Sequence, residues 1–112
     1  MTEQRVEEHL REKLKDPHFR ELYELEQQKN NIVKQIIAYR IKQGMTQGEL
    51  AGLVGVTQQH ISKIENGEFS SVVTLEKVLL AVGLTVRIKA IPLKPSLRRP
   101  ITHPRTHQSK RK

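Results

Sequence analysis

The segment from residue 45 to residue 67 constrains the fold of this chain most, because it contains signals for two short helices joined by a tight turn. Thr46 followed three residues later by Glu49 is a capping box, which starts a helix. Gly55 supplies the turn, and Thr57 caps a second helix that closes at an Asn-Gly pair. We therefore expect two helices of about eight residues each.

Apolar side chains inside this segment are spaced so that the two helices can pack together. Ala51 is small where the helices would approach each other. Gly48 and Gly52 are poor helix formers that each cost about 1 kcal/mol relative to alanine, so tertiary packing must hold the first helix. The residues expected to pack the pair are Leu50, Leu53, Val56, Ile61 and Ile64.

Helical patterns continue on both sides. A thin apolar stripe predicts a helix over residues 3–15, and Asp16-Pro17 ends it and starts a further helix that runs to Gln43. The pair Asn30-Asn31 leaves open one long helix or two. Gly44 ends this region, and Ser71 caps a helix over 72–82. The stripe consists of Val6, Leu10 and Leu14, and the inward residues of the last helix are Leu75, Val78, Leu79 and Val82.

After Gly83 the pattern changes to an alternation that predicts a half-buried β-strand over residues 84–91. A lone strand has unpaired edges, and the simplest remedy is the same strand of a second copy across a two-fold axis. A strand folded back on its own helices is the alternative. In the paired version Val86, Ile88 and Ala90 would form the dimer strand.

The charge distribution divides the chain into three parts: residues 1–30, a helical extension; 31–91, the main domain; and 92–112, a tail. The formal net charge is +8, which favours a polyanionic partner. The tail has seven bases, no acid and four prolines, so we expect disorder. It is either a solubilising end or a non-specific grip on phosphates.

Several function classes are disfavoured. Cysteine is absent, which excludes disulfides and thiolate metal sites. No apolar run is long enough for a membrane span, and no secretory signal is seen, so we expect a soluble cytoplasmic protein without a membrane partner. The scattered histidines do not predict a metal site. We expect no catalytic residues and no cofactor, hence no enzyme.

The outward face of the second short helix is polar and has no acid. Gln59 and Lys63 are four residues apart and project together. Glutamine can bond adenine edges, lysine can bond guanine acceptors, and the methyl of Thr57 could touch thymine. Thr46 and Gln47, at the start of the first helix with free backbone N–H groups, suit a phosphate. These properties indicate double-stranded DNA as a partner.

The segment from Met45 to Gly67 (MTQGELAGLVGVTQQHISKIENG) resembles the helix-turn-helix of the phage-repressor family often labelled XRE. The pattern is Thr-Gln-x-x-Leu-Ala, then Gly-Val-Thr, then Ile-Ser-x-Ile-Glu-Asn-Gly. The resemblance implies that Gln47 and Asn66 bind phosphates. It implies that Gln58, Gln59 and Lys63 face bases, and that Arg40 pairs with Glu65. His60 departs from the small residues common there and would contact a phosphate or a base, or fill space.

The longer stretch from His9 to Ile91 resembles HigA-class antitoxins of type II toxin–antitoxin pairs. The strand also resembles the dimer ribbon of HipB antitoxins. The resemblance implies a protein that neutralises a small ribonuclease toxin and represses its own operon. Phe19, Leu22 and Tyr23 would then bind the toxin, or else pack on their own domain. The alternative function is a stand-alone homodimeric repressor, and a remote third is a chromosome-binding protein that uses the tail.

Together these observations predict a mainly α protein. Its core would be a repressor-like helix-turn-helix bundle with an N-terminal helical extension and one C-terminal β-strand that forms an intersubunit ribbon. A homodimer would present the second helix of each helix-turn-helix to successive major grooves about 34 Å apart, on a palindromic operator.

Overall fold

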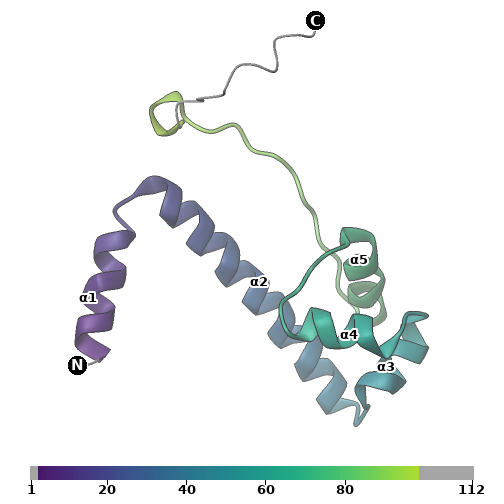
Figure 1. The fold of residues 1–112 in the computed structure, drawn as a ribbon. Coiled ribbons are helices and arrows are strands. Elements are labelled where there is room, and N and C mark those ends of the chain that lie inside the picture. Colours follow the sequence, from purple (N-terminus) through teal and green to yellow (C-terminus); the bar gives the residue numbers. More distant parts are fainter. Residues whose placement is uncertain (1–2, 99–112) are drawn as a thin grey trace, which may run out of the picture.

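The computed structural model describes residues 3–98, and this part of the chain is mainly helical, as predicted (Figure 1). Five α-helices are followed by a short 3-10 helix. Their bounds are α1 Glu3–Lys13, α2 Pro17–Lys42, α3 Gln47–Val54, α4 Gln58–Glu65, α5 Val72–Ala81 and η1 Pro95–Leu97.

Helix α2 begins where the sequence predicts it. The side chain of Asp16 accepts a hydrogen bond from the His18 backbone N–H at 3.1 Å, and Pro17 occupies the first helical position. The helix runs unbroken through Asn30-Asn31. One long helix is thus formed rather than two, and it passes straight through the position expected as a domain boundary.

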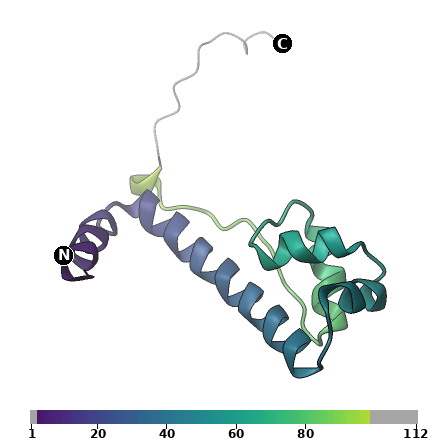
Figure 2. The same cartoon turned by 60° about the horizontal axis from the view of Figure 1, so that its bottom comes forward.

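The core lies where the C-terminal half of α2 meets α3, α4 and α5 (Figures 1 and 2). Ile36 is the only fully buried residue that α2 contributes among the residues described. Burial of one such side chain stabilises the fold by about 1.5–3 kcal/mol, so a core of this size gives the helical bundle only marginal stability. The buried residues are Ile36, Leu50, Ala51, Ile61, Ile64, Leu75, Val78 and Leu79.

The two short helices and their turn follow the sequence signals closely. Thr46 and Glu49 form the capping box at the start of α3. Gly55 ends α3 with φ of 89°, a left-handed conformation that favours glycine, and its N–H donates to Ala51 O at 2.8 Å. One packing prediction is wrong: Leu53 faces solvent, because the core side of α3 is formed by Leu50 and Ala51 instead.

The N-terminal half of α2 projects from the bundle and turns back at its far end into α1 (Figures 1 and 2). We call α1 and residues 17–31 the arm. No residue of the described arm is fully buried. Of the predicted apolar stripe, Leu10 and Leu14 are half-buried, whereas Val6 is exposed.

The predicted strand over 84–91 is not formed; residues 3–98 contain no β-strand. A strand needs a second backbone to pair with, and the single chain offers none. Instead the Glu76 carboxylate accepts the Val86 N–H at 3.2 Å and the Thr85 hydroxyl at 2.6 Å, which fixes the start of this segment on α5. Of the expected dimer strand, Val86 packs against the core, and Ile88 and Ala90 are exposed.

The chain after Ile91 leads away from the bundle (Figure 1). Where the tail was expected to be disordered from Pro92 onward, Pro95 begins the single 3-10 turn η1. The rest of that prediction concerns residues 99–112, which lie outside the part of the chain that the structure describes.

Candidate nucleic-acid interface

Helix α4 presents one polar face to solvent and buries the opposite one. Ile61 and Ile64 anchor it in the core. No acidic residue lies in its first turn. The side chains expected to read bases are all exposed and lie on α4 or at its N-cap; they are Thr57, Gln58, Gln59 and Lys63.

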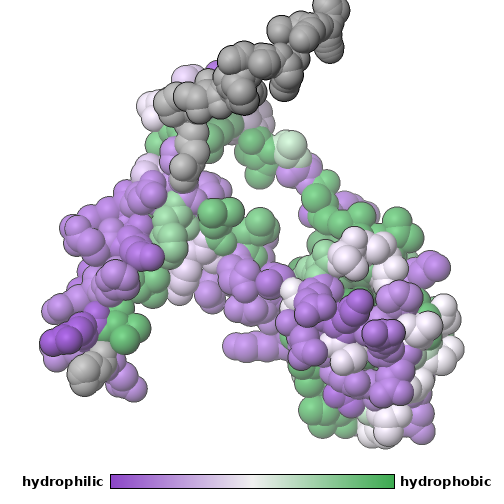
Figure 3. All heavy atoms as spheres, in the orientation of Figure 1, coloured by the Kyte–Doolittle hydropathy of each residue, from purple (hydrophilic) through white to green (hydrophobic). Residues whose placement is uncertain are grey.

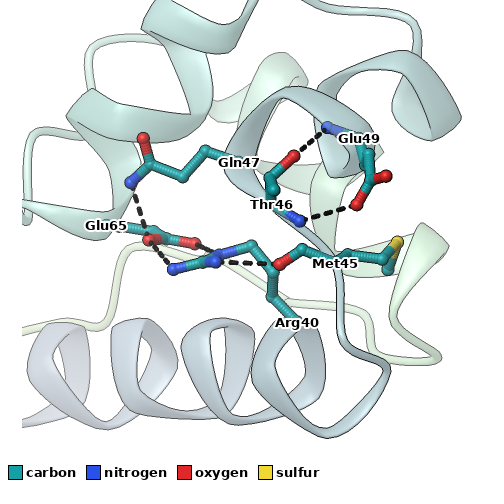
Figure 4. Close-up of polar contacts among 6 residues, drawn as sticks. All are labelled: Arg40, Met45, Thr46, Gln47, Glu49 and Glu65. Carbon is teal, nitrogen blue, oxygen red and sulfur yellow. Dashed lines mark hydrogen bonds and ion pairs between the residues drawn. The ribbon is translucent and has the colours of Figure 1, made fainter.

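The C-terminal end of α4 is held by a largely buried ion pair with α2 (Figure 4). Arg40 Nε lies 2.7 Å from Glu65 Oε2, and Arg40 Nη2 lies 3.0 Å from Glu65 Oε1, so the contact is bidentate. Arg40 Nη1 also donates to Met45 O at 3.0 Å. The Glu65 side chain is only 6% exposed. Hydrogen bonding to Glu65 raises the pKa of Arg40 above its ordinary value, so the guanidinium stays charged.

Gln47 connects this ion pair to the start of α3. Its Nε2 donates to Glu65 Oε1 at 3.0 Å (Figure 4). Within residues 3–98 its backbone N–H has no partner and is free to meet a phosphate. The Thr46 N–H was expected to be free as well, but it donates to the Glu49 carboxylate at 2.9 Å, because the capping box closes on itself.

The two glutamines at the start of α4 differ in their surroundings. A Cβ added at Gly48 would lie 3.5 Å from Gln58 Oε1, so the Gln58 side chain rests against the first turn of α3. Gln59 is exposed. Sequence reasoning, which treated Gly48 only as a poor helix former, missed this proximity of Gln58 to the first turn of α3.

His60 and Asn66 lie at opposite ends of α4. The backbone N–H of His60 donates to Thr57 Oγ1 at 3.2 Å, and its ring Nδ1 lies 3.4 Å from the Thr57 backbone nitrogen. His60 thus completes a second capping box, a role the sequence analysis did not assign. The signal was present as a threonine cap three residues before a side chain with an acceptor. Asn66 is the exposed C-cap residue of α4.

The three residues expected to bind a toxin lie on the arm, away from this interface (Figure 1). The rings of Phe19 and Tyr23 stack with centroids 6.2 Å apart, and Lys13 Nζ lies 5.5 Å from the Phe19 centroid. Both rings are half-buried, whereas Leu22 is 66% exposed. The structure therefore places the aromatic pair one turn apart on α2, with Leu22 facing solvent.

Helices α3 and α4, joined by the tight turn at Gly55, have the arrangement of a helix-turn-helix. A model of the helix-turn-helix family matches residues 36–88, which supports the XRE type. This segment is a helix-turn-helix domain. It spans the end of α2, the whole of α3, α4 and α5, and the start of the segment that follows. Comparison with curated proteins found no match, and comparison with solved structures found none. No helix among residues 3–98 is long and apolar enough to cross a membrane.

Proposed function

We propose that the chain is a homodimeric repressor that binds a palindromic DNA operator through α4. The observation that supports this most is the combination of an exposed, acid-free α4 face with a buried ion pair that fixes the helix from behind. A rigid helix with exposed amides and a lysine is suited to reading base edges in a major groove. Bound at a promoter, such a dimer would block transcription without chemistry.

The partner copy is proposed from an apolar groove on the outer side of α5. The groove has a volume of about 400 Å³ and lies between α5 and the segment after it. Val73 and Leu80 in its walls are 65% and 61% exposed. Solvent-facing apolar residues grouped in this way mark interaction sites. A second copy across a two-fold axis would cover the groove and bring a second α4 to the next half-site. Its lining is Val72, Val73, Glu76, Lys77, Leu80, Val86 and Ile88.

The test of the DNA proposal separates residues that contact bases (readers) from residues that contact phosphates or hold the helices in place (positioners). A preferred palindrome is first selected from random duplexes. Gln59→Ala is then expected to lose roughly 1–3 kcal/mol of the binding free energy that discriminates among bases at one position in each half-site. Gln47→Ala is expected to weaken all sequences alike, because it removes the side-chain bond to Glu65 that holds the start of α3, and with it the backbone N–H that would meet a phosphate, in place. The measurement is binding affinity on single-position variants of the site. If both variants changed every site equally, the assignment of readers and positioners would be wrong.

A second function, neutralisation of a protein toxin, is favoured by the arm. Leu22 and Leu25 on α2, and Val6 on α1, are each more than 60% exposed on a helical element that carries no core of its own. Figure 3 shows hydrophobic residues gathered between α1 and α2. We propose that a small ribonuclease toxin covers this face, as the resemblance to HigA-class antitoxins implies.

Co-purification distinguishes the antitoxin from the stand-alone repressor. The full chain would be expressed with the neighbouring small reading frame, beside a Leu22→Asp/Leu25→Asp variant. The antitoxin proposal expects a partner that comes down with the wild type and is lost with the variant, while DNA binding by the variant persists. If no partner is retained although the palindrome is bound tightly, the protein is a repressor that acts without a toxin.

A further inference from the structure

Both helices of the interface begin with a reciprocal capping box, but the two boxes use different chemistry. In α3 the third residue is Glu49, whose carboxylate accepts the Thr46 N–H at 2.9 Å. In α4 the third residue is His60. Its Nδ1 faces Thr57 twice, at 3.4 Å from the backbone nitrogen and at 3.1 Å from the hydroxyl oxygen. An imidazole has thus replaced the usual carboxylate at the start of the base-reading helix.

The geometry of this contact indicates which ring nitrogen of His60 acts as the acceptor. The Thr57 backbone N–H can only donate, so His60 Nδ1 must offer its lone pair, and the neutral ring carries its proton on Nε2. The cap is then closed without a negative charge. A glutamate in this place would bring a carboxylate to the end of α4 that faces the DNA, where it would repel phosphates. Lys63 and Glu68 line a small pocket with His60 and are the charged residues that face it.

We propose that His60 is a positioning residue of the DNA interface, which holds the first turn of α4 through Thr57 rather than binding DNA itself. This inference rests on the proposed DNA-binding function. Gln58 and Gln59 are the first two residues of the helix, between the cap and its partner. Their direction follows the backbone of this turn. When the turn frays, both side chains lose the direction needed to meet base edges.

The first measurement uses the free protein and two variants. His60→Ala removes the acceptor, whereas His60→Gln keeps one, since glutamine also serves in capping boxes. The Ile61 backbone N–H, which donates to Thr57 O, reports opening of the first turn by hydrogen exchange. We expect exchange at Ile61 to rise about fivefold in His60→Ala and to return to the wild-type rate in His60→Gln. Exchange at Val78 in α5 is the internal control and should not change.

Thr57 and His60 should also act as a unit. Because the two side chains bond each other, Thr57→Ala followed by His60→Ala should raise exchange at Ile61 by less than the product of the two single effects. Independent effects, or unchanged exchange in His60→Ala, would overturn the proposal.

The second measurement is DNA affinity over a range of salt concentrations. For a positioning role, His60→Ala weakens operator binding by a factor of about five, leaves the salt slope unchanged, and is rescued by His60→Gln. A direct phosphate contact by a charged His60 ring would instead lower the slope by about one in His60→Ala, with no rescue, and that result would overturn the proposal. Absence of specific DNA binding by the wild type would contradict the proposed function, while the exchange data would still decide the role of His60 in the helix.

Discussion

Three polar side chains from three helices, together with one backbone carbonyl, hold the inner side of α4, and each depends on the others. Glu65 receives two hydrogen bonds from Arg40 and one from Gln47, and Arg40 also bonds the Met45 carbonyl just before α3. Burial of a carboxylate costs free energy unless hydrogen-bonding partners surround it, and Arg40 and Gln47 supply them here. The network therefore joins α2, α3 and α4 and fixes the angle of α4 relative to the other two helices.

Arg40→Ala should reduce stability far more than loss of a surface ion pair. It leaves the Glu65 carboxylate buried without its main partner, and we expect the free energy of unfolding to fall by about 3 kcal/mol. Lys15→Ala is the matched control, because Lys15 and Glu12 form an exposed pair whose loss should cost less than about 1 kcal/mol. Urea denaturation of both variants gives the comparison. Similar small losses would mean that the network contributes little.

Two glycines of the same helix should respond to alanine in opposite directions. Gly52 lies inside α3 with open space where a Cβ would be, so Gly52→Ala should raise the free energy of unfolding by about 0.5–1 kcal/mol. Gly55 ends α3 with φ of 89°, and Gly55→Ala should lower it by about 1–2 kcal/mol. Thermal unfolding would measure both. Destabilisation by Gly52→Ala would indicate that this face of α3 has a partner.

Among the structural elements, the sequence predicted best the helix ends and turns, because these depend on residues close together in the chain. The caps at Asp16, Thr46 and Thr57 and the turn at Gly55 are set within three or four residues, and each helix begins or ends where those signals lie. The sequence left the continuity of α2 through Asn30-Asn31 open, because asparagine has a weak helix propensity. In the structure the helix continues, since the packing of Ile36 in the core outweighs that weak local propensity.

The elements that sequence reasoning missed depend on contacts distant in the chain. Alternation over 84–91 describes which residues could face a core, but pairing needs a second backbone that the pattern cannot supply. Glu76, nine residues before Thr85, captures this segment instead. In the interface, the residue types of the family pattern were visible in the sequence. The contact of Gln58 with Gly48, and of Gln47 with Glu65, became visible only in three dimensions.

The outer side of α5 carries the prediction about assembly. Leu80→Asp should convert the proposed dimer into a monomer, because a carboxylate would have to be buried when a second copy covers the groove. Leu22→Asp is the matched control, since Leu22 is exposed to a similar degree but lies on the arm. Sedimentation velocity would measure both. If Leu22→Asp dissociated the dimer and Leu80→Asp did not, the partner copy would bind the arm instead.

Charge acts at the scale of the whole molecule. The formal net charge is +8, and residues 92–112 contribute seven bases and no acid. The exposed α4 face adds one lysine and no acid, so its contribution to the proposed DNA binding is expected to come mostly from hydrogen bonds to bases. Affinity for DNA of any sequence and discrimination among sequences are therefore expected to come from different parts of the chain.

Neutralising the end of the chain should lower affinity without changing sequence preference. We expect Lys110→Ser, Arg111→Ser and Lys112→Ser together to weaken binding to the operator and to unrelated duplex DNA by the same factor. If all three residues meet phosphates, the slope of log affinity against log salt should fall by up to about 2.7, at about 0.9 for each contact. Lys13→Ser with Lys15→Ser, at the end of α1 and in the turn that follows it, removes charge elsewhere and should leave the slope unchanged. A loss of affinity confined to the operator would mean that these three residues contact bases. An unchanged slope would mean that they do not bind phosphates and that the basic end only increases solubility.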